Sequence, residues 1–167
     1  MFANCFNKTT WPWLAFLGSA GLLLGALAFE HIGGMAPCQM CYWQRHAHKA
    51  VLILAIAALL ARYMSKGGRW DTAFILLIGL AFTISFGLAF WHVGVEYKWW
   101  EGPKSCMASK GPIDFDPETL FSTDRKMPAC SDAPWDLFNI SMAGYNAAIS
   151  GIAALLSFVI GLGGKRS

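Results

Sequence analysis

Four predominantly apolar stretches of the chain are long enough to cross a lipid bilayer as helices. They cover residues 12–31, 45–64, 72–95 and 141–163. About 20 residues, each adding roughly 1.5 Å, span a hydrocarbon core of about 30 Å, so each stretch has the required length. The second stretch is the weakest, and it spans the bilayer if Lys49 and Arg62 extend toward opposite surfaces. The pattern predicts an all-α membrane protein, built as a four-transmembrane-helix bundle in one domain over residues 1–167.

The connections between these stretches differ in length and character. A short loop of about residues 32–44 joins the first two, and a long segment of about residues 96–140 joins the last two. The long segment is rich in proline, glycine and charge and has no long periodic pattern, which predicts a mostly irregular loop. Gly21 and Gly25 stand four residues apart in the first stretch, a spacing that favours close approach of a second helix.

Composition supports a membrane protein and excludes other classes. The chain is 56% hydrophobic and only 14% charged, unlike an ordinary soluble domain. A net charge of +3 with no basic face argues against nucleic-acid binding. Lys8, the apolar run after it and the sequence Ala26-Leu27-Ala28 resemble a signal peptide, but the run is long for one, and we interpret it as a span.

The distribution of positive charge predicts the orientation. One side of the bundle carries basic residues crowded into short flanks, namely Lys8, Arg62, Lys66, Arg69, Lys165 and Arg166. The basic residues of the long loop on the other side are mixed with many acids. Because short, positively charged flanks stay in the cytoplasm, both termini are expected there and both loops outside. Cys5 then lies in a reducing compartment, and we assign it no role.

The segment Pro37–Arg45 contains the residues with the clearest potential for chemical reactivity. Cys38 and Cys41 are spaced as C-x-x-C, which lets two sulfurs close a small ring and cycle between dithiol and disulfide. Cys41 should lie at the N-terminus of the second helix, where the helix dipole favours a thiolate. Arg45 is four residues further on and adds a permanent positive charge on the same face. This combination predicts a redox site.

A structural disulfide or half of a zinc site are the alternatives for this pair. Zinc usually requires four ligands, often from a second C-x-x-C. The other cysteines stand alone at positions 5, 106 and 130, and His46 and His48 do not have a usual zinc spacing. Haem attachment is disfavoured because no C-x-x-C-H occurs. The spacing therefore favours redox chemistry, and we expect no metal ligands.

Three further residues are candidates outside the C-x-x-C segment. Cys106 and Cys130 fall in the outer loop, where two cysteines most often form a structural disulfide that stabilises the fold by roughly 3 kcal/mol. That loop has little core of its own, so such a bridge could also open easily. His92 should lie near the level of Cys41 and Arg45, and either an interfacial or a functional role fits it. Glu30 and His31 end the first span and receive no assignment.

Together these motifs resemble the DsbB family. The resemblance rests on a C-x-x-C followed by Gln44-Arg45 after the first span, a cysteine pair in the second outer loop, and Trp135-Asp136 before the last of four spans. Members of this family are bacterial inner-membrane thiol oxidases that reoxidise the periplasmic oxidant DsbA and pass electrons to quinone. The resemblance covers nearly the whole chain.

The resemblance implies a location, a cofactor and a partner. The protein would be a multi-pass protein of the bacterial inner membrane with both cysteine loops in the periplasm, including the long irregular loop between helices 3 and 4. Its cofactor would be a membrane quinone, ubiquinone or menaquinone. Its partners would be the lipid bilayer and a periplasmic DsbA-like thioredoxin-fold protein.

The resemblance also implies residue roles. Cys38 and Cys41 would form the quinone-facing pair, with Cys41 as the thiolate that engages the quinone. Arg45 would support quinone binding and reduction, and His92 would lie near the ring.

Cys106 would form the mixed disulfide with the partner, and Cys130 would be its mate. Gln44 stands where many members have Glu. Two alternatives remain: a membrane scaffold whose disulfides are purely structural, and a DsbB-like paralogue that serves a dedicated partner.

Overall fold

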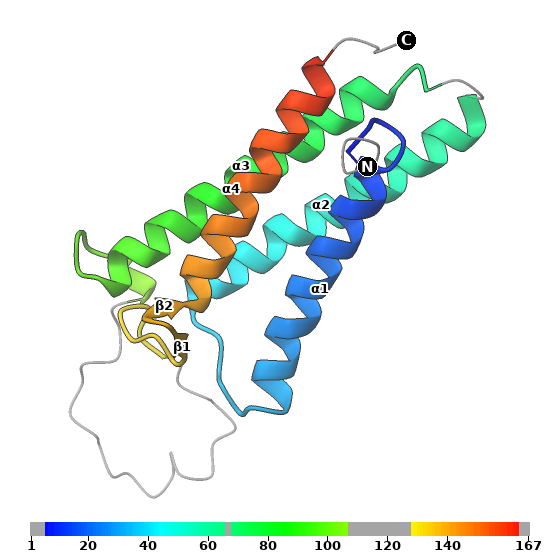
Figure 1. Ribbon diagram of the computed structural model, residues 1–167. Helices are drawn as coiled ribbons and strands as arrows, with labels where there is room; N and C mark the ends of the chain where they lie inside the picture. Colours follow the sequence, from blue (N-terminus) through cyan, green and yellow to red (C-terminus); the bar gives the residue numbers. More distant parts are fainter. Residues whose placement is uncertain (1–5, 66–67, 107–127, 164–167) are drawn as a thin grey trace, which may run out of the picture.

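Four long helices dominate the computed structural model, which describes residues 6–65, 68–106 and 128–163. They pack side by side as a bundle (Figure 1) and have the bounds α1 Trp11–His31, α2 Gln39–Ser65, α3 Asp71–Glu96 and α4 Met142–Leu162. Each is long and apolar enough to cross a membrane. The predicted four-transmembrane-helix bundle is confirmed. Cys5 and residues 107–127 of the long loop lie outside the described residues.

The helix termini follow local sequence signals. Pro12 occupies the first turn of α1, where its missing N–H has no helical partner to lose. Ser141 is the N-cap of α4, and its Oγ accepts a hydrogen bond from the N–H of Gly144 at 3.2 Å.

The second helix begins earlier than predicted. α2 starts at Gln39 rather than near residue 45, so the expected loop of about residues 32–44 is shorter. Tyr42 N–H already bonds to Cys38 O at 3.3 Å. The first turns of α2 carry polar and aromatic side chains, so the apolar run that marks the helix in the sequence begins later than the helix itself.

The interior of the bundle consists of small and medium-sized side chains. One core cluster joins all four helices through Ala15, Val51, Ala55, Ile78, Ala81, Phe82 and Ala154. Four serines are completely buried: Ser19, Ser85, Ser150 and Ser157. Large apolar residues such as Leu24 and Leu155 instead cover the outside. An interior more polar than the surface is typical of helices that associate in lipid, where small residues and hydrogen bonds hold the interface.

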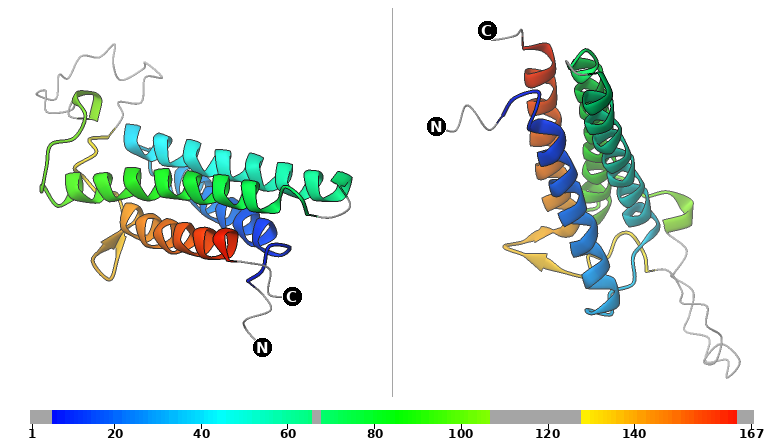
Figure 2. Two further views of the ribbon diagram at one scale, coloured as in Figure 1. Left: turned by 90° about the horizontal axis from the view of Figure 1, so that it is seen from above. Right: turned by 90° about the vertical axis from the view of Figure 1, so that its right-hand side faces the viewer.

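The two ends of the bundle are built differently. At one end the start of α1 meets α3 and α4, since Lys8 Nζ donates to Thr72 Oγ1 at 2.9 Å and to Gly161 O at 3.2 Å. Arg62 pairs with Asp71 at the same end. The other end carries the link between α1 and α2 and the segments around Cys106 and Cys130 (Figure 2).

A short β-hairpin precedes α4 where the sequence predicted only irregular loop. Strands β1 (Asp136–Leu137) and β2 (Ile140–Ser141) pair antiparallel. Phe138 and Asn139, at the turn, have positive φ angles of 53° and 59°, as in the tight two-residue turns of hairpins. Because the strands are only two residues long, they leave no alternating pattern in the sequence.

The contact between α3 and α4 depends on Gly79, because a Cβ there would lie 2.9 Å from the Cβ of Ser157. We expect Gly79→Leu to lower the free energy of unfolding by about 1–3 kcal/mol through overpacking. Gly87→Leu on the same helix is the matched control, since an added Cβ there meets nothing within 4 Å. Thermal unfolding in detergent micelles, followed by circular dichroism, measures both. Equal midpoints for the two variants would contradict this packing.

Candidate redox site

Cys38 and Cys41 lie at the N-terminus of α2. Cys38 immediately precedes the helix and Cys41 lies in its first turn, as the sequence predicts. Their sulfurs are 2.8 Å apart and are not bonded, and the Cys41 N–H donates to Cys38 Sγ at 3.3 Å. The side-chain hydrogen bond with Cys41, together with burial, raises the pKa of the Cys38 thiol. Both effects favour the protonated form of Cys38.

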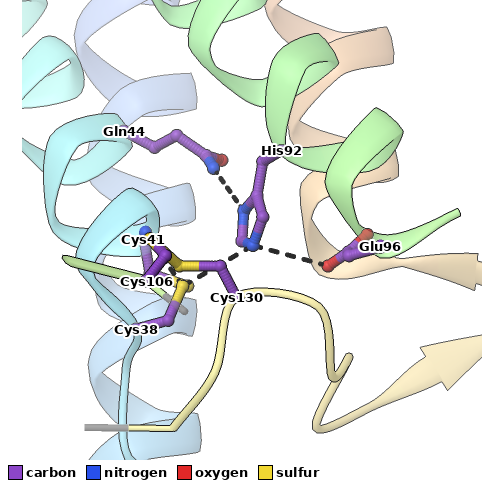
Figure 3. The surroundings of a disulfide bond; sticks show 7 residues. All are labelled: Cys38, Cys41, Gln44, His92, Glu96, Cys106 and Cys130. Carbon is purple, nitrogen blue, oxygen red and sulfur yellow. Dashed lines mark hydrogen bonds and ion pairs between the residues drawn. A yellow bond between two sulfur atoms is a disulfide. The ribbon is translucent and has the colours of Figure 1, made fainter. Parts of the chain in front are cut away.

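Cys106 and Cys130 form a disulfide beside this pair. Cys106 ends the short 3₁₀ helix η2 (Lys104–Cys106), and Cys130 lies in the segment that leads to the hairpin. Both pack with Cys38, Met40 and Val95 in one buried cluster, in contact with Cys41. Figure 3 shows the four cysteines together. The disulfide of the long loop packs against the ends of α2 and α3.

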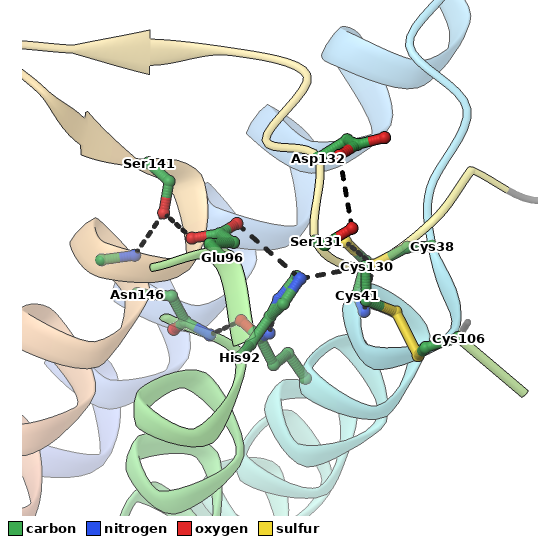
Figure 4. A network of polar contacts seen from close by, with 12 residues as sticks. Cys38, Cys41, His92, Glu96, Cys106, Cys130, Ser131, Asp132, Ser141 and Asn146 are labelled. Carbon is green, nitrogen blue, oxygen red and sulfur yellow. Dashed lines mark hydrogen bonds and ion pairs between the residues drawn. A yellow bond between two sulfur atoms is a disulfide. The ribbon is translucent and has the colours of Figure 1, made fainter. Parts of the chain in front are cut away.

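His92 connects α3 to the cysteines. Its Nε2 lies 3.6 Å from Cys38 Sγ and 3.7 Å from Glu96 Oε1, as Figure 3 shows. Its Nδ1 lies 2.8 Å from Gln44 Nε2. Glu96 is oriented in turn by Ser141, whose Oγ donates to Glu96 Oε2 (Figure 4). His92 is buried in this site, whereas an interfacial role would leave it at the surface.

A hydrogen-bonded network extends from His92 into the bundle. Asn146 Nδ2 donates to Gln44 Oε1 at 2.7 Å, and Asn146 Oδ1 lies 2.8 Å from His48 Nε2. His48 Nδ1 lies 3.1 Å from Ser19 Oγ. The sequence analysis missed this network. Polar residues within apolar spans are the available signal, because such residues are rare in membrane helices and usually have a partner.

Arg45 bridges α2 and α1. Its Nη1 forms an ion pair with Glu30, and its Nη2 donates to Ala26 O at 3.1 Å. The guanidinium also lies 5.5 Å from the centre of the Tyr42 ring. Glu30, which the sequence left without a role, is therefore the charge partner of Arg45. A pair separated by 15 residues in different helices leaves no signal in the sequence.

A cavity of about 390 Å³ opens beside the cysteine pair, a size typical of small-molecule sites. Its polar lining includes Cys41, Arg45 and His92, the three residues expected to surround a quinone, together with Gln44 and Asn146, which were not predicted. Apolar residues of α1 and α4 complete the lining, among them Leu22, Phe29 and Ile149. Apolar walls and a few polar groups on one side fit the ring and tail of a quinone.

Two glycines contribute space to this cavity. Gly21 and Gly25 were expected to allow close helix packing, and that expectation is wrong. A Cβ at either would meet nothing within 4 Å, and both line the cavity. The absence of their side chains widens the cavity.

The site also has three atoms that could ligate a metal. The sulfurs of Cys38 and Cys41 and a ring nitrogen of His92 lie within 4.8 Å of one another. A structural zinc site uses four ligands, and no fourth joins this group among the described residues. The absence of a metal stays a prediction.

The Arg45–Glu30 pair leads to a prediction about stability. Glu30→Gln leaves the guanidinium without its charge partner, and we expect a loss of about 1–2 kcal/mol in the free energy of unfolding. The loss is smaller than for a fully buried pair because the side chains are 13% and 17% exposed. Adding Arg45→Gln should restore part of it. Chemical unfolding in micelles measures the double-mutant cycle, and additive losses would show that the pair is not coupled.

Comparison with known proteins identifies relatives over most of the chain. The family model described as "Disulfide bond formation protein DsbB" matches residues 8–160. Disulfide bond formation protein B of Xylella fastidiosa (strain 9a5c) is 30% identical over 172 residues, covering 96% of each chain. The protein of the same name from Xanthomonas campestris pv. campestris (strain 8004) is 32% identical over 136 residues, 77% of this chain and 76% of its own.

No solved structure matches the chain. The family model nevertheless covers α1, α2, α3, all but the last two residues of α4, and all four cysteines of the site. By this match and by its four membrane-spanning helices, the protein is a multi-pass membrane protein that belongs to the DsbB family.

Proposed function

We propose that this protein is a disulfide-forming oxidoreductase that oxidises the dithiol of a periplasmic DsbA-like thioredoxin-fold protein and passes the electrons to a membrane quinone. The observation that carries the proposal is the position of the Cys106–Cys130 disulfide against the unbonded Cys38–Cys41 pair, beside a cavity. Membership of the DsbB family supports the disulfide-forming activity. Neither scaffolding nor a purely structural bridge requires two cysteine pairs in one buried cluster.

The outer pair receives electrons first. A thiolate of the partner attacks Cys106, and Cys130 leaves as a thiolate and takes up a proton. The second partner thiol then attacks the mixed disulfide, which releases oxidised partner and leaves Cys106 and Cys130 as a dithiol. The partner has lost two electrons and two protons.

The inner pair then relays the electrons. The Cys106–Cys130 dithiol reduces a Cys38–Cys41 disulfide by the same exchange chemistry and becomes a disulfide again. The outer cysteines are only 3% and 1% exposed, and their contact with Cys38 favours this internal exchange. The resulting Cys38–Cys41 dithiol would give two electrons and two protons to a bound quinone and become a disulfide again.

Arg45 and Cys41 are the residues proposed to act on the quinone. Both line the cavity, and Cys41 lies one helical turn before Arg45. A fixed guanidinium stabilises negative charge that develops on an oxygen of the ring. Glu30 holds the guanidinium in place through its ion pair.

The charge distribution supports an orientation in the bacterial inner membrane. Lys8 and Arg62 lie at the end of the bundle opposite the cysteines. Because basic flanks remain in the cytoplasm, that end and both termini would be cytoplasmic and the cysteine segments periplasmic.

The role of Cys41 can be tested with purified protein, a reduced thioredoxin-fold dithiol protein and a soluble quinone. We expect Cys41→Ser to bring quinone reduction, followed by absorbance, down to the uncatalysed rate, because Cys38, the sulfur that remains beside the cavity, has no second cysteine with which to form the inner disulfide. One equivalent of partner should still be oxidised by the Cys106–Cys130 disulfide. Cys5→Ser is the control and should turn over as the unmodified protein does. Quinone reduction that persists in Cys41→Ser would argue for a scaffold with structural disulfides.

The cavity can be tested separately from the cysteines. Gly25→Leu should fill part of it and raise the KM for quinone severalfold, while oxidation of the partner in a single turnover stays unchanged. Gly18→Leu is the matched control, since Gly18 also has open space around it but does not line the cavity. The same KM in both variants would place the quinone elsewhere.

A further inference from the structure

The hydrogen bonds of the buried network behind His92 have no role in the proposed function, although Gln44 and Asn146 also line the cavity. It takes Ser19 from α1, Gln44 and His48 from α2, Ser85 and His92 from α3, and Asn146 and Ser150 from α4. In the described part of the chain, no buried side-chain nitrogen or oxygen lacks a partner. A network that is satisfied throughout can have a defined direction of hydrogen bonding, and that direction determines where protons lie.

The direction of hydrogen bonding in the network follows from His92, the member nearest the cysteines. His92 Nε2 faces Cys38 Sγ at 3.6 Å and the Glu96 carboxylate at 3.7 Å. Figure 4 shows the ring between these two groups. A carboxylate accepts hydrogen bonds and cannot donate them, so the ring proton belongs on Nε2. An unprotonated Nε2 there would place two lone pairs against each other in a buried site.

The remaining bonds agree with this choice. Gln44 Nε2 approaches His92 Nδ1 at 2.8 Å, which requires Nδ1 to be an unprotonated acceptor. The amide oxygen of Gln44 then accepts from Asn146 Nδ2 at 2.7 Å. Asn146 Oδ1 accepts from His48 Nε2 at 2.8 Å and from Ser150 Oγ at 2.9 Å. With the proton on His92 Nε2, the orientation of each amide follows from that of its neighbour.

We propose that Asn146 and Gln44 are positioning residues that hold His92 as the neutral tautomer with its proton on Nε2, directed at Cys38 Sγ. The proposal rests on the proposed function, since it explains how the charge is placed within the same cysteine pair. Cys38 Sγ accepts from His92 Nε2 and from the Cys41 N–H at 3.3 Å. Its own S–H is thereby directed to Cys41 Sγ, 2.8 Å away. When one of the two thiols has lost its proton, the network therefore favours Cys41 as the thiolate and Cys38 as the thiol.

The tautomer can be measured directly. Protein labelled with ¹⁵N-histidine, in detergent micelles with the Cys38–Cys41 pair reduced, gives long-range ¹H–¹⁵N correlations that distinguish protonated from unprotonated ring nitrogens. His92→Gln assigns the signals. We expect an unprotonated Nδ1 and a protonated Nε2 on His92. A protonated Nδ1 in the unmodified protein would overturn the proposal.

Two variants test which residues hold the tautomer. In Gln44→Glu a carboxylate can only accept, so His92 Nδ1 should become protonated. In Asn146→Leu, Gln44 loses the neighbour that orients it, and both tautomers should appear. Ser157→Ala is the control: it removes a buried hydroxyl of α4 that bonds to Trp11 Nε1 at 2.9 Å, and His92 should keep its tautomer. Retention of the original tautomer in Asn146→Leu would overturn the proposal.

The rate of quinone reduction tests the positioning role separately from the proposed function. Loss of an orienting partner of a functional histidine typically costs roughly tenfold or more, so Asn146→Leu should lower the rate of quinone reduction about tenfold while Ser157→Ala leaves it unchanged. Unchanged turnover in Asn146→Leu would refute the positioning role and leave the oxidoreductase function intact. An unmodified protein that shows the expected tautomer but oxidises no dithiol would refute the function alone.

Discussion

The structure depends on one constraint: polar groups inside a membrane bundle must be satisfied by other groups of the protein. Gln44, His48 and Asn146 meet this requirement by bonding to one another and to Ser19, Ser85 and Ser150, across all four helices. Because each bond fixes the position of two helices, the same network that satisfies polar groups also sets the register of the bundle. It ends at His92, and so it connects the packing of the helices to the chemistry of the cysteines.

The two cysteine pairs illustrate how a loop without a core can be held in place. Cys106 and Cys130 pack on Met40 and Val95 at the ends of α2 and α3. Their burial protects the disulfide from random thiols in solution and brings it to the inner pair. The same contacts leave Cys106 only 3% exposed.

An ion pair and two glycines make different contributions to the cavity. The Arg45–Glu30 pair carries no net charge, so the guanidinium can remain beside an apolar cavity without a large cost of desolvation. Gly21 and Gly25 supply room on the α1 side. Cys41 and Arg45 line the cavity from the first turns of α2, and the contacts of the guanidinium with Glu30 and Ala26 O hold it in position.

The sequence alone determined the number and type of the helices, because an apolar run of sufficient length is a local property that the bilayer itself selects. It also placed Cys41 and Arg45 one helical turn apart, with Cys38 just before them, since C-x-x-C and i, i+4 spacings are local too. Only the tertiary structure decided that Glu30 neutralises Arg45, that His92 contacts Cys38 rather than the surface, and that Asn146 orients Gln44. These contacts join residues on different helices, and their geometry depends on how the helices pack, which no pattern of neighbouring residues contains.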